Sequence, residues 1–242
     1  MEDNQQTNVS EEEQYKEFKR IRRLDEAKAS IAKIECDCTS AYVDKASLKE
    51  TCKEANGLEL GAIVVLPSFV KSCVSFLGKD PKTSVIGAIS YPLGGDTIEI
   101  KTASVKKAVR DGVDEVEVCA PMSFIRDGNW AYFKKECKKL KKAAKIRALR
   151  IVIDCSMLNE KELIRACTIA ADAGANCLRL NAADGDTVAK IKGVLKGKCL
   201  IKAERADNAA AFGTLCTMGA DYVCCASACN LANYLLKYAE NE

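Results

Sequence analysis

Four residues with charged or reactive side chains follow four glycines at one fixed spacing. The segments Gly112-Val-Asp-Glu-Val-Glu-Val, Gly174-Ala-Asn-Cys-Leu-Arg-Leu and Gly219-Ala-Asp-Tyr-Val-Cys-Cys repeat one pattern, and Gly197-Lys-Cys-Leu-Ile-Lys is a looser copy. The residues five positions after these glycines are Glu117, Arg179, Cys224 and Lys202. A lysine amine beside a guanidinium can act as a nucleophile if the neighbouring cation depresses its pKa. The same two cations can instead hold an anion without reacting with it.

The glycines indicate how the chain brings these side chains together. Each glycine is expected to end a helix in the left-handed conformation, with a strand beginning two or three residues later. Side chains alternate between the two faces of a strand, so equivalent positions in the four copies face the same way. In a closed parallel barrel that direction is the interior, near the carboxyl ends of the strands where barrel enzymes keep their sites. We therefore predict that Glu117, Arg179 and Lys202 form one charged cluster, because charges within a strand must be paired or solvated.

The rest of the sequence supplies the elements of such a barrel. Short β-like runs recur at Ile31–Cys36, Ile63–Leu66, Val85–Ile89, Glu115–Cys119, Leu149–Ile153, Cys177–Leu180, Leu200–Lys202 and Tyr222–Cys225. Most are separated by segments with helical periodicity, which predicts βαβ units and a parallel sheet. Eight such units in 242 residues favour a single α/β domain, a (β/α)8 TIM barrel. We expect this barrel over residues 31–242, and a short N-terminal extension over residues 1–30 that is helical from Glu11 to Ser30.

Composition excludes several classes of protein. No apolar run is long enough to span a membrane, and we expect no secretory signal because the N-terminal residues are polar and acidic. A net charge of +3 is too small to indicate a nucleic-acid-binding protein. The chain contains no histidine, which excludes Ser/His and Cys/His catalytic arrangements. Its 14 cysteines are scattered through apolar segments without a CxxC pair. We therefore expect buried free thiols in a reducing, cytoplasmic compartment and no metal site.

One stretch of the chain is strongly basic. Nine lysine and arginine residues lie between Lys134 and Arg150. Apolar residues at helical spacing predict a buried stripe of Phe133, Cys137, Leu140 and Ala144, which leaves the lysines on the outer face of a helix. That face is either simply solvated or a docking surface for an acidic protein or another polyanion. No RNA-binding aromatic motif accompanies it.

Several short motifs occur in one order along the chain. They are Asp37-Cys-Thr, Val64-Val-Leu-Pro, Ile86-Gly-Ala-Ile-Ser-Tyr-Pro-Leu-Gly, Asp114-Glu-Val-Glu-Val, Arg126-Asp-Gly-Asn-Trp and Leu149-Arg-Ile-Val-Ile-Asp. In this order they resemble the deoxyribose-phosphate aldolase family over most of residues 31–236. The resemblance implies a class I aldolase that needs no cofactor, in which a lysine forms a Schiff base while an aspartate and a second lysine assist. It also implies phosphate binding by glycines and serines after the last two strands, and a dimer or larger assembly.

Several positions of that family site carry different residues in this chain. The Schiff-base lysine corresponds to Arg179, whose delocalised and permanently protonated guanidinium lacks the free amine that an imine requires. The aspartate corresponds to the longer Glu117, and the second lysine is retained as Lys202. The family's Lys-x-x-Gly-Gly is replaced by Lys202-Ala-Glu-Arg-Ala, whose side chains should keep an anion away from the backbone. The candidate substrate-binding residues are Asp37, Arg205 and Ser227.

Three functions remain open at this point. The first is an aldolase-like barrel that does not cleave 2-deoxyribose 5-phosphate and has a binding, scaffolding or regulatory role. The second is an active class I aldolase or lyase that uses Lys202 on an altered sugar phosphate or aldehyde. The third is a sensor in which Arg179 and Lys202 hold an anionic small molecule without reacting.

Overall fold

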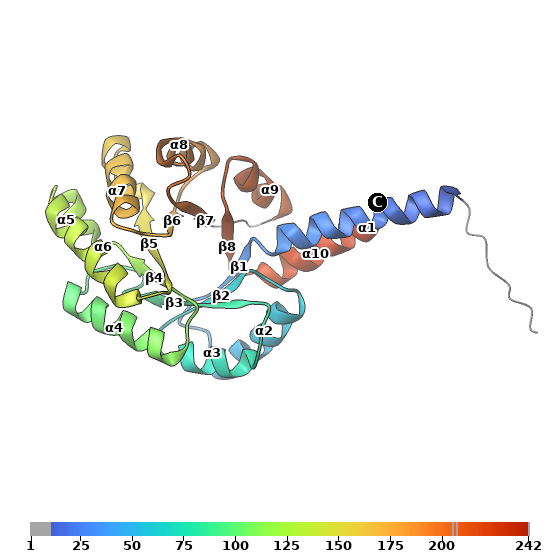
Figure 1. The fold of residues 1–242 in the computed structure, drawn as a ribbon, viewed down its shortest axis with the longest axis horizontal. Coiled ribbons are helices and arrows are strands. Elements are labelled where there is room, and N and C mark those ends of the chain that lie inside the picture. Colours follow the sequence, from blue (N-terminus) through green and yellow to red (C-terminus); the bar gives the residue numbers. More distant parts are fainter. Residues whose placement is uncertain (1–10, 205, 207, 242) are drawn as a thin grey trace, which may run out of the picture.

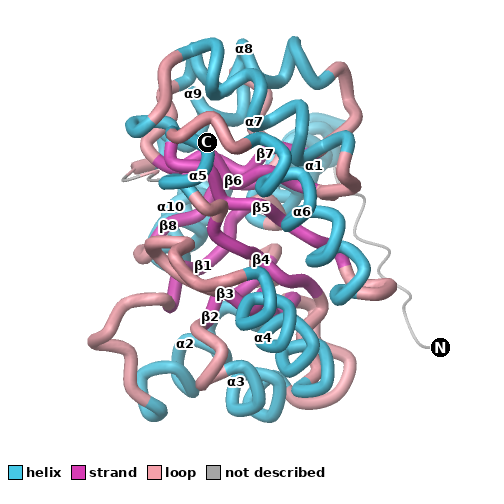
Figure 2. The backbone as a smooth tube through the Cα atoms, turned by 90° about the vertical axis from the view of Figure 1, so that its left-hand side faces the viewer, coloured by secondary structure: helices cyan, strands magenta, loops and turns pink. Residues whose placement is uncertain are grey.

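The strands of the protein close into a barrel surrounded by helices. A computed structural model describes residues 11–204, 206 and 208–241 of the chain. Within these residues the eight strands are parallel and pair in sequence order, and β1 also pairs with β8 (Figure 1). Figure 2 shows the strands in the centre with the helices around them. The predicted (β/α)8 TIM barrel with an N-terminal helix is therefore confirmed.

The strands are short and almost entirely buried. They are β1 (Ile34–Cys38), β2 (Ala62–Val65), β3 (Ser84–Ile89), β4 (Glu115–Cys119), β5 (Ala148–Asp154), β6 (Cys177–Asn181), β7 (Leu200–Glu204) and β8 (Tyr222–Cys225). The prediction for the first strand was wrong by three residues at its start. Ile31 instead ends the preceding helix, because the amide of Ala32 still donates to the carbonyl of Lys28 at 3.0 Å.

The helices form the outer layer. They are α1 (Glu11–Ile31), α2 (Lys45–Gly57), α3 (Val70–Leu77), α4 (Ile98–Asp111), α5 (Met122–Arg126), α6 (Trp130–Ala144), α7 (Glu160–Asp172), α8 (Gly185–Leu195), α9 (Ala209–Thr217) and α10 (Ala228–Asn241), with a 3-10 turn η1 at Cys155–Met157. Six of them are capped by a side chain that accepts a backbone N–H group, from Asp44, Thr97, Asn129, Asn159, Asp184 and Asn208. None of the described helices is both long and apolar enough to cross a bilayer.

The glycine repeat has the predicted geometry and a further structural role. Gly112, Gly174 and Gly219 adopt φ values of 102°, 98° and 105°, in the region that favours glycine. Two residues after each glycine, a short polar side chain accepts the backbone N–H of the second residue in the preceding strand. The side-chain oxygen of Asp114 accepts the N–H of Val85 at 2.9 Å, that of Asn176 accepts the N–H of Leu149 at 3.0 Å, and that of Asp221 accepts the N–H of Ile201 at 2.8 Å. The repeat therefore sets the register between adjacent strands.

The basic stretch was predicted to lie on one helix. It extends instead from helix α6 into strand β5. The apolar stripe of α6 is buried as predicted, and six of its neighbouring lysines lie on the outside. However, α6 ends at Ala144, and Arg150 lies inside the barrel on β5 with only 2% of its surface exposed. Arg150 is inside because the strand alternates its side chains and carboxylates of β1 and β4 receive its guanidinium.

Helix α1 extends from the barrel beside α10, as Figure 1 shows. Leu24 and Ile31 face the protein, whereas Tyr15, Phe18 and Ile21 are 58%, 63% and 48% exposed. The predicted helix from Glu11 is therefore present, but only part of its apolar side chains contributes to the core.

Candidate functional site

The predicted cluster lies inside the barrel. Glu117 on β4, Arg179 on β6, Lys202 on β7 and Cys224 on β8 are all 0% exposed. Arg179 and Lys202 are direct partners across the β6–β7 pair. The shared spacing from the four glycines thus places these side chains on the interior face, as expected.

Arg179 is surrounded by carboxylates. Its guanidinium donates to Glu117 Oε1 at 2.7 Å and to Asp37 Oδ2 at 2.9 Å, and it also pairs with Glu204. Its Nε donates to Asn181 Oδ1 at 2.9 Å, and its Cζ lies 5.4 Å from the centre of the Tyr91 ring. These contacts use the fork of N–H donors that a guanidinium presents and a single ammonium does not.

Lys202 is held between two buried carboxylates. Its ammonium lies 2.7 Å from Glu117 Oε2 and 2.8 Å from Glu35 Oε2. Glu117 therefore joins the two cations, because its other oxygen receives Arg179. Deeper in the barrel, Arg150 donates to the other oxygen of Glu35 at 2.6 Å and to both oxygens of Glu115, at 2.7 and 2.8 Å. The charges form one connected network from Glu115 to Glu204.

The network keeps Glu117 and Lys202 ionised. Burial by itself would raise the pKa of Glu117, but Lys202 and then Arg179 outweigh burial and hold that pKa at about 2. Burial would lower the pKa of Lys202, but the acidic groups around it, Cys224, Glu117 and Glu35, raise it above its ordinary value. Since burial also raises the pKa of the Cys224 thiol, Cys224 is neutral near pH 7 and the carboxylates hold the charge on Lys202. Arg179 acts to lower the pKa of Lys202, as expected, but the two carboxylates outweigh it, so the expected net depression of that pKa is wrong.

A cleft opens at the carboxyl ends of the strands. It has a volume of about 670 Å³ and is lined by Asp37, Thr39, Ser40, Tyr91, Glu204, Cys224, Cys225, Ala226 and Ser227. Two of the predicted substrate-binding residues, Asp37 and Ser227, line it, whereas Arg205 is outside the described residues. Thr39 donates its hydroxyl and its backbone N–H to Asp37, so Asp37 is fixed toward Arg179. Arg179 and Lys202 lie beneath this cleft and do not line it.

The sequence prediction missed Glu35 and Glu115 and did not identify Glu204 as a partner of Arg179. A signal for them exists in the sequence. Polar or charged residues recur at two-residue spacing within single strands, at Glu35 and Asp37, Glu115 and Glu117, Arg179 and Asn181, and Lys202 and Glu204. Such pairs point to the same side of a strand, so each strand contributes two levels of the network. Elsewhere, no group of at least three Cys, Asp or Glu residues in the described chain is arranged to hold a metal ion.

The chain matches known proteins in sequence and in fold. A family model for DeoC/LacD family aldolases covers residues 24–221. The chain belongs to the DeoC/LacD aldolase family. A deoxyribose-phosphate aldolase of Clostridium botulinum is 31% identical over 149 residues, which cover 58% of this chain and 70% of that protein. The aldolase QR15 superposes with a TM-score of 0.81 at 22% identity, covering 86% of this chain and 96% of that one. A tetrameric deoxyribose phosphate aldolase from Aeropyrum pernix superposes with a TM-score of 0.77 at 17% identity, covering 89% and 94%.

The similarity to the two structures shows the fold alone, and the membership of the DeoC/LacD family rests on the match to residues 24–221. Within this aldolase family member, the interior position on β6 that faces Lys202 is occupied by an arginine with four hydrogen-bonding partners.

Proposed function

We propose that this DeoC/LacD family member does not cleave 2-deoxyribose 5-phosphate and that it acts as a binding or scaffolding protein built on an aldolase barrel. The observation that carries the proposal is the state of the two interior cations next to the cleft. Imine formation requires a neutral amine with a free lone pair within reach of the substrate carbonyl. Arg179 has no such amine, and the amine of Lys202 is protonated, buried and held by two carboxylates.

The charge of the interior also argues against an anionic substrate. The three interior cations Arg150, Arg179 and Lys202 face five carboxyl groups, those of Glu35, Asp37, Glu115, Glu117 and Glu204. Asp37 and Glu204 are the acidic members that line the cleft. A phosphate that entered would meet their carboxylates before it could reach either cation. This arrangement disfavours both the anion sensor and a sugar-phosphate lyase.

The direct test is an aldolase assay coupled to detection of the released aldehyde. We expect no turnover of 2-deoxyribose 5-phosphate above the rate without protein, while the C. botulinum relative, run in parallel, serves as the working standard. Borohydride added with the substrate should leave no adduct on Lys202 by peptide mass spectrometry. Turnover near the rate of the standard would overturn the proposal.

An Arg179→Lys variant separates the causes of inactivity. If it gains measurable cleavage, the loss lies in this one side chain. If it stays silent, the acidic cleft and the altered segment after Lys202 are sufficient to exclude the reaction.

The anion-sensor alternative is tested by thermal unfolding with a panel of sugar phosphates, from which we expect no stabilisation. A rise in the melting temperature with one of them would favour that alternative.

A further inference from the structure

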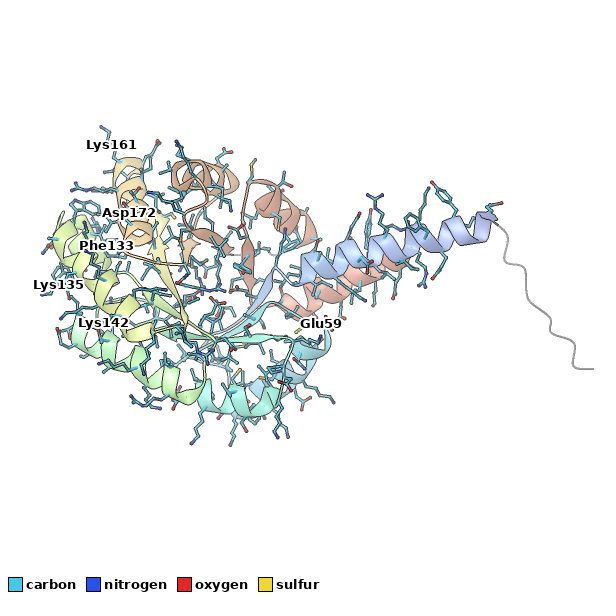
Figure 3. The ribbon with its side chains drawn as sticks, in the orientation of Figure 1. Glu59, Phe133, Lys135, Lys142, Lys161 and Asp172 are labelled. Atoms are coloured by element: carbon cyan, nitrogen blue, oxygen red, sulfur yellow. The ribbon has the colours of Figure 1, made fainter. Side chains whose placement is uncertain are left out.

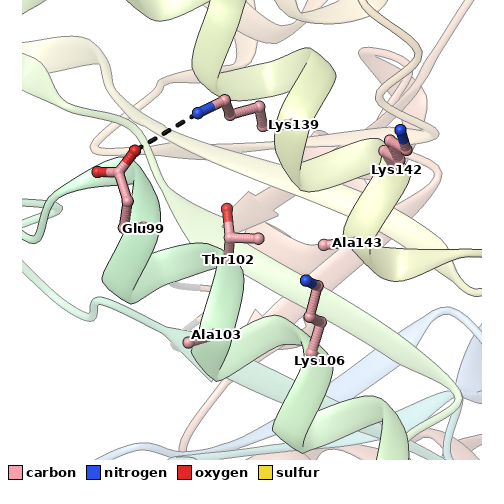
Figure 4. A pocket seen from close by; sticks show the side chains of 7 residues that line it. All are labelled: Glu99, Thr102, Ala103, Lys106, Lys139, Lys142 and Ala143. Carbon is pink, nitrogen blue, oxygen red and sulfur yellow. Dashed lines mark hydrogen bonds and ion pairs between the residues drawn. The ribbon is translucent and has the colours of Figure 1, made fainter.

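A basic groove runs along the outside of the barrel between α4 and α6. Its deeper part has a volume of about 560 Å³ and is lined by Glu99, Thr102, Ala103, Lys106, Lys139, Lys142 and Ala143 (Figure 4). A second hollow of about 280 Å³ shares Lys106, Lys142 and Ala143 and continues toward Arg110 and Lys145. None of these residues lines the cleft at the barrel mouth.

Small residues line the groove, and a buried ion pair joins its two helices. Beneath the outer surface, Lys101 of α4 pairs with Glu136 of α6 at 2.9 Å and also donates to the carbonyl of Cys119 at 2.9 Å. These contacts fix the two helices against each other and against β4. Ala103 and Ala143 have small side chains and leave space in the groove, and the hydroxyl of Thr102, which also lines it, has no hydrogen-bond partner among the described residues.

The rim of the groove carries an excess of positive charge. Lys106, Arg110, Lys139, Lys142 and Lys145 stand along it, and Glu99 is the one acidic residue among those that line the two hollows. Glu99 is paired with Lys139 at 3.4 Å. Lys106 and Lys142 form no ion pair with another described residue, and both are exposed. Lys135 and Lys142 of α6, labelled in Figure 3, are exposed, whereas Phe133 is buried.

We propose that the basic groove is a docking site for an acidic peptide segment of a partner protein. The carboxylates of such a segment would meet the lysines on both rims, and small side chains or backbone would occupy the alanine floor. Glu99 and Arg110 are eleven residues apart on α4, which corresponds to about 16 Å along the helix axis. An extended segment of about five residues spans that length.

The shape and composition of the groove favour a peptide over a nucleic acid. Its lining contains no aromatic residue on which a base could stack. The groove is also confined between two helices, whereas the net charge of the whole chain is only +3. The site is separate from the barrel interior, so it can fail or succeed independently of the proposed function.

The first experiment measures binding of fluorescein-labelled hexaglutamate to the full chain by fluorescence anisotropy, with a short labelled oligothymidylate in parallel. We expect hexaglutamate to bind the wild-type protein at low salt and to weaken as salt is raised. A Lys106→Glu/Lys142→Glu variant should lose about ten-fold in affinity. The control is Lys134→Glu/Lys161→Glu, which changes the net charge equally at exposed lysines outside the groove, and we expect it to lose less than about two-fold.

A third variant tests the groove itself and not only its charge. Ala103→Leu fills the floor without changing the charge, and it should weaken hexaglutamate by several-fold. Circular dichroism and thermal unfolding establish that each variant is folded, and Lys106→Gln/Lys142→Gln replaces the charge reversal if that variant is not. The proposal is overturned if hexaglutamate does not bind at low salt, or if the two double variants weaken it equally. It is also overturned if oligothymidylate binds more tightly and shows the same dependence on Lys106 and Lys142.

Discussion

Replacing Arg179 by methionine should strongly lower the free energy of unfolding, because the interior network loses one of its cations. Methionine is also a long, flexible side chain, but it removes the cation that contacts Glu117, Asp37 and Glu204. Breaking a buried pair by removing one partner costs about 3–5 kcal/mol, because the other charge stays buried without compensation. For a chain of this size, that loss lowers the melting temperature by about 10 °C. We therefore expect Arg179→Met to lose about 3–5 kcal/mol in free energy of unfolding at pH 7.

The pH dependence of the same variant gives a sharper signature. In the wild-type protein the pKa of Glu117 is depressed to about 2, so its stabilisation is complete above the unfolded pKa and is lost only as pH falls toward 2. Wild-type stability should then vary little from this group between pH 5 and 7. In Arg179→Met, Glu117 keeps Lys202 but loses Arg179, so its folded pKa rises toward the ordinary range and acidification to pH 5 relieves part of the cost. The difference between the two proteins should shrink on acidification.

The assay is equilibrium unfolding in urea at pH 7 and pH 5, followed by circular dichroism. Arg147→Met is the matched control, because Arg147 lies 3.6 Å from Asp114 and both side chains are more than one third exposed. That exposed pair should contribute less than about 1 kcal/mol. A cost for Arg179→Met that is no larger than the cost for Arg147→Met, or that does not depend on pH, would refute the conclusion that Arg179 compensates the buried carboxylates.

Two further predictions test the backbone and the thiols. Gly94→Ala should cost at least about 3 kcal/mol, because Gly94 has φ 65° and an added Cβ would lie 2.0 Å from the carbonyl oxygen of Ala120. Gly193→Ala, in the open interior of α8, should be neutral or stabilising by up to about 1 kcal/mol, and urea unfolding of both variants compares them. Rapid labelling of the native protein by a thiol reagent should be confined to the three half-buried cysteines, Cys155, Cys216 and Cys229. The other 11 should react only on unfolding, and prompt labelling of a larger number would contradict their burial.

Much of the architecture is encoded locally and is therefore visible in the sequence. The alternation of apolar runs with helical segments predicts the eight βα units, because periodicities of 2 and 3.6 residues reflect which face of each element is buried. The glycine repeat predicts that Glu117, Arg179, Lys202 and Cys224 share the interior, because a fixed distance from a helix end fixes the direction of a side chain in the next strand. The motif order similarly indicates the aldolase family to which the chain belongs.

The tertiary structure alone decides how those side chains pair and which charge states result. Arg179 and Asp37 are 142 residues apart, and Lys202 and Glu117 are 85 apart, so only closure of the barrel makes them neighbours. The pKa of Lys202 depends on whether carboxylates or the guanidinium dominate its surroundings, and a sequence pattern does not give those distances. The groove between α4 and α6 is likewise tertiary, because its two rims come from segments about 30 residues apart that pack over one buried ion pair. The sequence determines which residues each element presents to the interior or the surface, and packing determines what those residues meet.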